Sequence, residues 1–175
     1  MTKLIDQKIS LRKALSHKRE IIKKNSICEF NIKFFNELKK HIDFEEINAV
    51  ASFVSIRSEI STKKLNKKII ELGKILSFPI IEKTSEDLIF KISDPNKKFK
   101  LGKFNIPEPN NESEVIIPQL YFVPCLGFDL DGYRIGYGGG FYDKTFAKLK
   151  QLKLKFYSVG FAFDEQKQNK LPVES

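Results

Sequence analysis

Residues 120–149 read LYFVPCLGFDLDGYRIGYGGGFYDKTFAKL, and the order of the parts of this stretch decides the expected fold. Residues 120–124 are apolar, rich in β-forming side chains and end in proline, which predicts a buried strand. Residues 141–149 predict a helix, and the segment between the two holds six of the nine glycines of the chain. A strand, a glycine-rich loop and a helix in succession are typical of α/β proteins, whose ligands bind beyond the carboxyl ends of the strands.

Outward from this stretch, the chain alternates predicted helices with predicted strands. Further helices are predicted over residues 4–22, from Ser26 to about Lys40, and from Ser61 or Thr62 to Leu72 with Gly73 as the C-cap. Ser26 and Glu29 have the spacing of a capping box. Further strands are predicted over residues 47–54, 75–81, 88–92 and 156–163, and residues 94–119 are expected to be irregular. This alternation predicts a layered α/β fold with a mostly parallel sheet.

Length and composition favour a single domain. The chain has 175 residues, of which 41% are hydrophobic, enough for a sizeable core. It contains no apolar run long enough for a transmembrane helix, and its first residues have no secretory apolar region. Two cysteines and two histidines cannot form a disulfide framework or a spaced Cys/His zinc site. A cytoplasmic protein without a membrane partner is expected.

The chain is basic, with a formal net charge of +9 at pH 7. Only four of its 31 basic residues are arginines, and the frequent Lys, Ile and Asn indicate a compositional bias. The charge has two interpretations: a solvated lysine-rich surface, or attraction of a polyanion such as a nucleotide, a polycarboxylate or a nucleic acid. A nucleic-acid-binding module is the less favoured class, because the lysines are scattered and no RNP-type motif, zinc finger or helix-turn-helix is present.

The glycine-rich segment has the chemistry of an anion site. Glycines let backbone N–H groups approach phosphate closely, and the helix N-terminus adds partial positive charge. Arg134 could fork onto phosphate oxygens, and Asp143 could hold Mg²⁺ together with phosphate. The spacing fits neither a Walker A loop nor the dinucleotide fingerprint. The alternative is a structural turn, with Asp131-Gly132 closing a hairpin between Phe128 and Ile135.

The stretch from Val123 to Asp143 resembles the signature of the 5-formyltetrahydrofolate cyclo-ligase family, also called methenyltetrahydrofolate synthetase. The likeness lies in Val-Pro at 123–124, Leu-Gly-Phe-Asp at 126–129, Arg-Ile-Gly at 134–136 and Gly-Phe-Tyr-Asp at 140–143. Three further segments resemble the family, and they follow in the expected order: Lys8–Arg12, Ser55–Thr62 and Phe104–Pro109.

This resemblance implies a three-layer α/β/α Rossmann-like fold in one domain over residues 1–175. It implies an ATP- and Mg²⁺-dependent ligase, expected to be monomeric, that closes 5-formyltetrahydrofolate to 5,10-methenyltetrahydrofolate and releases ADP and phosphate. ATP would phosphorylate the formyl oxygen, and the neighbouring N10 amine would then displace phosphate. A paralogue of the family that acts on or binds another substrate is the alternative.

The resemblance also implies roles for individual residues. Those implied to bind ATP are Lys8, Arg12, Arg134, Ile135, Gly136, Tyr137, Gly138, Gly139, Gly140, Phe141 and Tyr142. Arg134 and Tyr142 are implied to be catalytic, and Asp143 to bind Mg²⁺. Those implied to contact the folate are Val54, Glu59, Phe104, Tyr137, Gly138, Gly139, Gly140 and Phe141. Glu59 is implied to hydrogen-bond the pterin ring, and Phe104 to stack on the folate.

Some of these residues have plainer interpretations. Lys8 and Arg12 share one face of a helix and could simply be solvated. Glu59 could cap a helix or lie on the surface, and Val54 could belong to a buried strand. Phe104 could anchor a core or a loop.

The chain departs from the family pattern at four places. Cys125 stands where glycine is usual, which requires negative φ or strain at that turn. Phe141 replaces a tyrosine, and Tyr137 occupies a position that is often basic. The chain ends at Ser175, before an Asp that the resemblance places among the magnesium ligands.

Overall fold

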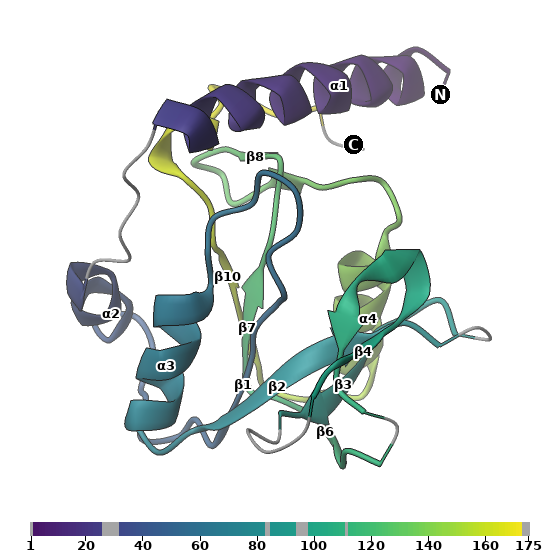
Figure 1. Cartoon of the computed structure of the whole chain (residues 1–175). Coiled ribbons are helices and arrows are strands. Elements are labelled where there is room, and N and C mark those ends of the chain that lie inside the picture. The colour runs from purple at the N-terminus through teal and green to yellow at the C-terminus, as the bar shows by residue number, and fades with distance from the viewer. Residues whose placement is uncertain (1, 26–31, 83–84, 94–97, 111, 173–175) are drawn as a thin grey trace.

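The computed structural model describes residues 2–25, 32–82, 85–93, 98–110 and 112–172. At its centre is a six-stranded sheet in the order β10-β7-β1-β2-β3-β6 (Figure 1). Its strands are β1 (Ala49–Ala51), β2 (Ile75–Ile80), β3 (Ile89–Ile92), β6 (Val115–Ile116), β7 (Leu120–Val123) and β10 (Tyr157–Gly160). Strands β1, β2, β7 and β10 are parallel, and β3 pairs antiparallel with β2 and β6. The expectation of a mostly parallel sheet is confirmed.

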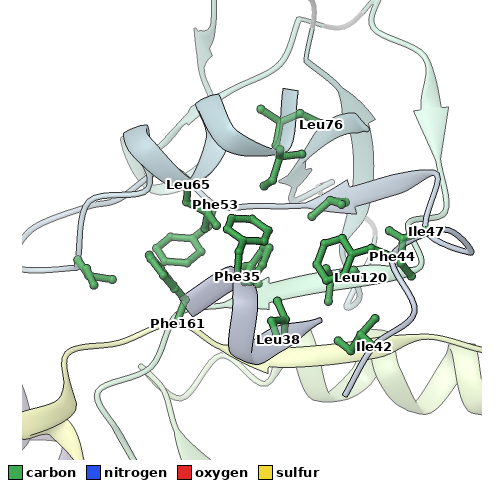
Figure 2. Close-up of a cluster of buried hydrophobic side chains, with 14 of the residues drawn as sticks. Phe35, Leu38, Ile42, Phe44, Ile47, Phe53, Leu65, Leu76, Leu120 and Phe161 are labelled. Atoms are coloured by element: carbon green, nitrogen blue, oxygen red, sulfur yellow. The ribbon is translucent and has the colours of Figure 1, made fainter. Parts of the chain in front are cut away.

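Helices cover both faces of this sheet. The helices are α1 (Thr2–Asn25), α2 (Ile32–Leu38), α3 (Lys63–Glu71) and α4 (Phe141–Gln151). On one face, Phe35 of α2 packs edge-on against Phe122 of β7, with ring centroids 6.5 Å apart, in a cluster that includes Leu65 of α3 (Figure 2). On the other face, Tyr121 of β7 meets Phe146 of α4 at 5.4 Å.

These contacts follow from the alternation of side chains along a strand, since neighbouring residues point to opposite sides. Tyr121 and Phe122 are both buried, one on each face. Parallel strands covered on both sides read as continuous apolar runs, which is why residues 120–124 lack polar alternation. The three-layer α/β/α architecture is confirmed.

Helix α1 lies across the end of the sheet rather than on either face (Figure 1). Leu15 of α1 packs in a small separate cluster with Leu126, Ile135 and Leu171. Leu126 comes shortly after β7, so one side of α1 faces the segment that follows the carboxyl end of this strand. This placement brings basic residues of α1 to the ligand-binding edge expected of an α/β sheet.

The expectation that residues 94–119 are irregular is wrong in part. Strand β4 (Lys100–Leu101) pairs with β5 (Pro107–Glu108) across the 3-10 turn η1 (Lys103–Asn105), and β6 extends the main sheet. Strands of two residues have no measurable periodicity, so the pattern of side chains could not reveal them.

One expected helix cap differs from the structure, and another lies outside the described residues. Thr62 occupies the N-cap position of α3, but its hydroxyl donates to the Phe53 carbonyl at 2.9 Å instead of capping the helix. Ser26 and Glu29, the expected capping box, lie outside the described residues. Gly73 follows α3 with φ of +70°, as expected of a C-terminal glycine. Within the part of the chain that the structure describes, no helix is both long and apolar enough to cross a membrane.

Candidate functional site

The glycine-rich segment divides into a hairpin and a loop. Strands β8 (Gly127–Phe128) and β9 (Arg134–Ile135) pair antiparallel, and the Asp129 N–H donates to the Tyr133 carbonyl at 3.0 Å. Gly132 takes φ of +85° in the turn. The hairpin interpretation therefore holds for residues 127–135. Residues 136–140, which we call the glycine loop, connect this hairpin to α4.

The glycine loop leads directly into the N-terminus of α4, which has no side-chain cap. Gly140 occupies the N-cap position of α4 with φ of +67°, and no side chain caps the helix there. The first backbone N–H groups of a helix have no partner within it and carry partial positive charge. The start of α4 can therefore bind an anion through its backbone.

Arg12 of α1 reaches the glycine loop directly. Its Nε donates to the Gly136 carbonyl at 3.1 Å. Its guanidinium carbon lies 3.2 Å from the point where a Cβ on Gly138 would stand, and Gly138 has φ of +101°. Position 138 thus favours glycine for its conformation, and a side chain there would also press on the Arg12 guanidinium. Lys8 lies one helical turn before Arg12 and is half-buried.

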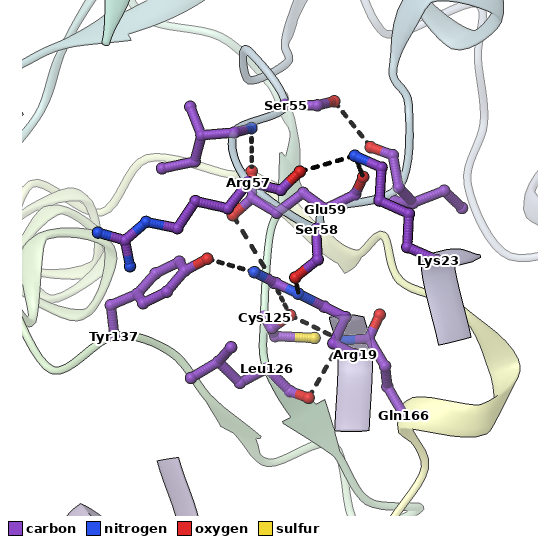
Figure 3. Close-up of polar contacts among 12 residues, drawn as sticks. Arg19, Lys23, Ser55, Arg57, Ser58, Glu59, Cys125, Leu126, Tyr137 and Gln166 are labelled. Carbon is purple, nitrogen blue, oxygen red and sulfur yellow. Dashed lines mark hydrogen bonds and ion pairs between the residues drawn. The ribbon is translucent and has the colours of Figure 1, made fainter. Parts of the chain in front are cut away.

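Arg19, also on α1, is the most connected residue of the site. Its side chain is 1% exposed. Nε donates to Ser58 Oγ at 3.1 Å, Nη1 donates to the Cys125 carbonyl at 3.0 Å, and Nη2 donates to the Tyr137 hydroxyl (Figure 3). Arg19 therefore joins α1, the segment after β1, the segment after β7 and the glycine loop.

Glu59 lies beside Arg19 and is 4% exposed, so it is not a surface residue. Its Oε2 accepts the Ile56 N–H at 2.9 Å, and its Oε1 lies 3.8 Å from Arg19 Nη1. Burial raises the pKa of Glu59 above its ordinary value, although the Ile56 hydrogen bond and the charges of Arg19, Lys23 and Arg57 act in the opposite direction. Desolvation outweighs these contacts because the carboxylate is almost fully removed from water.

Arg134 and Asp143 flank the glycine loop and pair across it. Arg134 Nη2 lies 2.8 Å from Asp143 Oδ1, and the guanidinium lies 5.9 Å from the ring centre of Tyr142. The Tyr142 hydroxyl is buried and has no hydrogen-bond partner among the described residues. Burial raises the pKa of Tyr142, so its hydroxyl stays protonated. It is a donor without an acceptor at the start of α4.

Phe104 and Val54, expected to contact the folate, lie in different settings. Phe104 is 67% exposed, which excludes a buried core anchor. Its backbone has φ of +61°. Lys103 Nζ lies 5.5 Å from the Phe104 ring centre and 5.8 Å from that of Phe141, so η1 approaches the start of α4. Val54 is half-buried and packs against the cluster under α2 and α3.

Cys125 has a structural role in the site, because its backbone carbonyl accepts two side-chain hydrogen bonds. Its backbone does not take positive φ, so cysteine replaces glycine there without that strain. Burial raises the pKa of its thiol to about 11, which keeps it neutral. Its carbonyl accepts from Arg19 and from Gln166 Nε2, the latter at 2.8 Å.

A magnesium site built by the protein alone is not present in the described residues, which contain no group of three His, Cys, Asp or Glu side chains placed to hold a metal. Mg²⁺ usually takes one or two carboxylates and completes its shell with water and substrate phosphates. Asp143, 70% exposed at the mouth of the glycine loop, fits the role of such a single carboxylate.

The residues that reasoning from sequence missed are Arg19, Arg57, Ser58 and Gln166. Arg19 looks like one more basic residue on a lysine-rich helix. The feature that could have indicated its role is the residue type, because arginine is rare in this chain. A guanidinium is preferred over an ammonium where one side chain must donate to several acceptors in fixed geometry.

The fold and the site together define an α/β protein with an arginine-lined candidate ligand site at the carboxyl edge of a parallel sheet. The model of the 5-formyltetrahydrofolate cyclo-ligase family matches residues 5–175. The chain belongs to this family, and the resemblance stated from its motifs is confirmed.

Known proteins agree with this assignment. The 5-formyltetrahydrofolate cyclo-ligase of Escherichia coli K12 is 32% identical over 132 residues, covering 73% of this chain and 71% of that protein. The mouse protein of the same name is 30% identical over 145 residues, covering 77% and 71%.

Two solved structures share the fold. The 5,10-methenyltetrahydrofolate synthetase of Aquifex aeolicus superposes with a TM-score of 0.68 at 26% identity, covering 96% of this chain and 84% of that chain. The synthetase of Mycoplasma pneumoniae superposes with a TM-score of 0.64 at 22% identity, covering 94% and 90%.

Proposed function

We propose that this chain is an ATP-dependent ligase that converts 5-formyltetrahydrofolate to 5,10-methenyltetrahydrofolate, with release of ADP and phosphate. The observation that carries the proposal is the contact of Arg12 with the glycine loop at the uncapped start of α4. Family membership supplies the reaction class. The geometry supports phosphate binding there, because the Arg12 guanidinium lies beside the glycine loop at the start of α4.

ATP binds at the glycine loop in this proposal. The N–H groups at the start of α4 face the phosphates, and Lys8 and Arg12 approach from α1. Arg134 stands on the other side of the loop, where its bond to Asp143 holds the guanidinium in place. Phosphate binding at this point uses both the helix dipole and positively charged side chains held in fixed positions. A flexible surface lysine would bind phosphate less specifically.

The folate binds beside the same loop. Glu59 offers a carboxylate on the segment after β1. Among the described residues its Oε1 has only the 3.8 Å ion pair with Arg19, which is too long for a hydrogen bond. Val54 and Phe104 provide apolar contacts, and Phe104 is exposed enough to stack on a ring. The raised pKa of Glu59 suits a group that exchanges hydrogen bonds with a heterocycle.

The chemistry requires activation of an inert oxygen. The formyl oxygen attacks the γ-phosphorus of ATP, and the bond from that phosphorus to ADP breaks. The N10 amine then attacks the formyl carbon, loses its proton, and the carbon–oxygen bond breaks as phosphate leaves. Arg134 neutralises charge on the transferred phosphoryl group, and the unpartnered Tyr142 hydroxyl donates a hydrogen bond to a developing negative oxygen.

Magnesium would be held by Asp143 together with phosphate oxygens, and when bound it offsets phosphate charge. The pairing of Asp143 with Arg134 keeps this carboxylate at the mouth of the loop. The expectations of a monomer, of a cytoplasmic location and of no nucleic-acid partner stay predictions.

Incubation of the purified chain with ATP, Mg²⁺ and 5-formyltetrahydrofolate tests the proposal. The expected result is a rise in the absorbance of the methenyl product, with one ADP formed per product. Product formation without ATP, or ADP formation without product, would contradict it.

A further inference from the structure

All four arginines of this lysine-rich chain converge on the glycine loop and its flanks. Arg12 bonds to Gly136, Arg19 bonds to Tyr137, and Arg134 leads into the loop. Arg57 stacks on Tyr137, with its guanidinium carbon 5.3 Å from the ring centre. Neither the sequence motifs nor the proposed function gives a ligand-binding role to Arg19 or Arg57, and of these two only Arg57 is exposed.

The backbone of Arg57 is held in an unfavourable conformation. Its φ is +52°, in the left-handed region that non-glycine residues rarely adopt. The turn around it is fixed by the Glu59 N–H, which donates to the Ile56 carbonyl at 3.0 Å, and by Lys23 Nζ, which donates to the Arg57 carbonyl at 2.7 Å. Such strain persists where surrounding contacts hold it, and it gathers at ligand-binding positions.

The side chain of Arg57 is oriented but has no polar partner. It extends along the Tyr137 ring, whose hydroxyl is fixed from the other side by buried Arg19 (Figure 3). Among the described residues, the Arg57 guanidinium makes no hydrogen bond and no ion pair, and the residue is exposed. Its N–H groups therefore stand available beside the glycine loop in a planar fork.

We propose that Arg57 is a further ligand-binding residue of this site, which binds an oxyanion through its guanidinium fork while Tyr137 holds the group in place. The inference rests on the proposed function. The oxyanion is either a phosphate of the nucleotide or a carboxylate of the folate's glutamate tail, because both present oxygen pairs that match a guanidinium. Arg57 stands on the segment after β1, two residues from Glu59.

The test compares Arg57→Gln and Arg57→Lys with the unmodified chain. Gln removes the charge but keeps the backbone preferences of a long unbranched side chain, so folding is preserved. Lys keeps the charge and loses the fork. Lys67→Gln is the matched control, because it removes the same charge from an 80% exposed position on α3. Calorimetric titration measures the Kd for ATP and for 5-formyltetrahydrofolate with one glutamate and with several.

Arg57→Gln is expected to weaken one of these ligands by about tenfold or more, the usual effect of losing a charged hydrogen bond. The Kd of Arg57→Lys for that ligand is expected to lie between those of Arg57→Gln and the unmodified chain. The Kd of Lys67→Gln is expected to stay within about twofold of that of the unmodified chain. Weakening confined to ATP assigns a phosphate; weakening that grows with the number of glutamates assigns a carboxylate. Equal binding of every ligand by Arg57→Gln and the unmodified chain overturns the inference.

A double variant tests whether Arg57 and Tyr137 act together in ligand binding or only stack on each other. Tyr137→Leu removes the platform, so it is expected to weaken the same ligand, and adding Arg57→Gln to it should weaken that ligand little further. Full additivity would contradict a shared role. An unmodified chain that forms no product overturns the proposed function itself, whereas an active chain indifferent to Arg57→Gln overturns only the assignment of Arg57.

Discussion

Arg19 and Glu59 form an ion pair inside the protein, with Nη1 3.8 Å from Oε1 and both side chains almost fully buried. The pair is loose because Arg19 directs its hydrogen bonds to Ser58, Cys125 and Tyr137 instead. A buried charge without a close partner is costly. Glu59 is thus held in an environment that favours its protonated form, as its raised pKa indicates.

Replacement of Glu59 by Gln tests this environment through pH. Because folding raises the pKa of Glu59 above 4.5, the protonated carboxyl stabilises the fold at low pH, and that stabilisation is lost as pH rises through the folded-state pKa. The unfolding free energy of the unmodified chain, relative to Glu59→Gln, should therefore fall over that window. The slope cannot exceed about 1.4 kcal/mol per pH unit for one proton. Urea denaturation across acidic to neutral pH measures it, and a rising difference would contradict the assignment.

The unpartnered hydroxyl of Tyr142 predicts opposite effects on stability and on activity. Tyr142→Phe removes a buried polar group that has no partner, so the unfolding free energy should stay equal or rise by about 1 kcal/mol. Turnover should fall by about a hundredfold if the hydroxyl serves the transition state. Tyr133→Phe, at an exposed tyrosine of the hairpin, is the control and should change neither quantity. Loss of stability in Tyr142→Phe would show that the hydroxyl has a structural partner.

Asp143→Asn should separate metal binding from folding. The Arg134–Asp143 pair is largely exposed on the Asp143 side, so its loss should cost less than about 1 kcal/mol of unfolding free energy. Turnover should fall strongly, and the Mg²⁺ concentration for half-maximal activity should rise. Glu86→Gln breaks a comparable exposed pair with Lys144 on the same helix and should leave the Mg²⁺ dependence unchanged. Equal Mg²⁺ curves for both variants would remove Asp143 from the metal site.

Two glycines of one loop give a matched pair of variants. Gly138→Ala places a side chain at φ of +101° and 3.2 Å from the Arg12 guanidinium, so it should lower the unfolding free energy by about 1–3 kcal/mol and weaken ATP binding. Gly136→Ala meets no atom within 4 Å and has no positive φ, so it should be tolerated. Thermal unfolding and ATP titration compare them. Similar losses in both would show that the loop needs flexibility and not a fixed conformation.

The elements that could be predicted from sequence are those with a dense local signal. The apolar run at residues 120–124 and the glycines before residue 141 define β7 and α4 because each pattern is complete within a few residues. Strands β4, β5 and β6 were missed because their pairing depends on partners along the chain and not on their own two residues.

The site was predictable where a motif is continuous and not where it is assembled. The glycine loop and Asp143 follow from one stretch of sequence. Arg19 owes its role to Cys125 and Tyr137, which lie 106 and 118 residues further along. Its spacing from Leu15 and Ile22 places it on the buried side of α1, but that spacing does not reveal its acceptors. The roles of Val54 and Phe104 stay predictions, since they depend on the ligand.

The long reach of Arg19 has a consequence for biosynthesis. During translation, Arg19 is made 106 residues before the Cys125 carbonyl that will accept its hydrogen bond. Until that carbonyl leaves the ribosome, the Arg19 side chain lacks the buried environment that it has in the folded protein. Leu15 likewise lacks Leu126, Ile135 and Leu171, against which it packs. Contacts between such distant residues form slowly, so the first helix made is among the last to be docked. The contacts of Arg19 can therefore form only after Cys125 and Tyr137 have been synthesised.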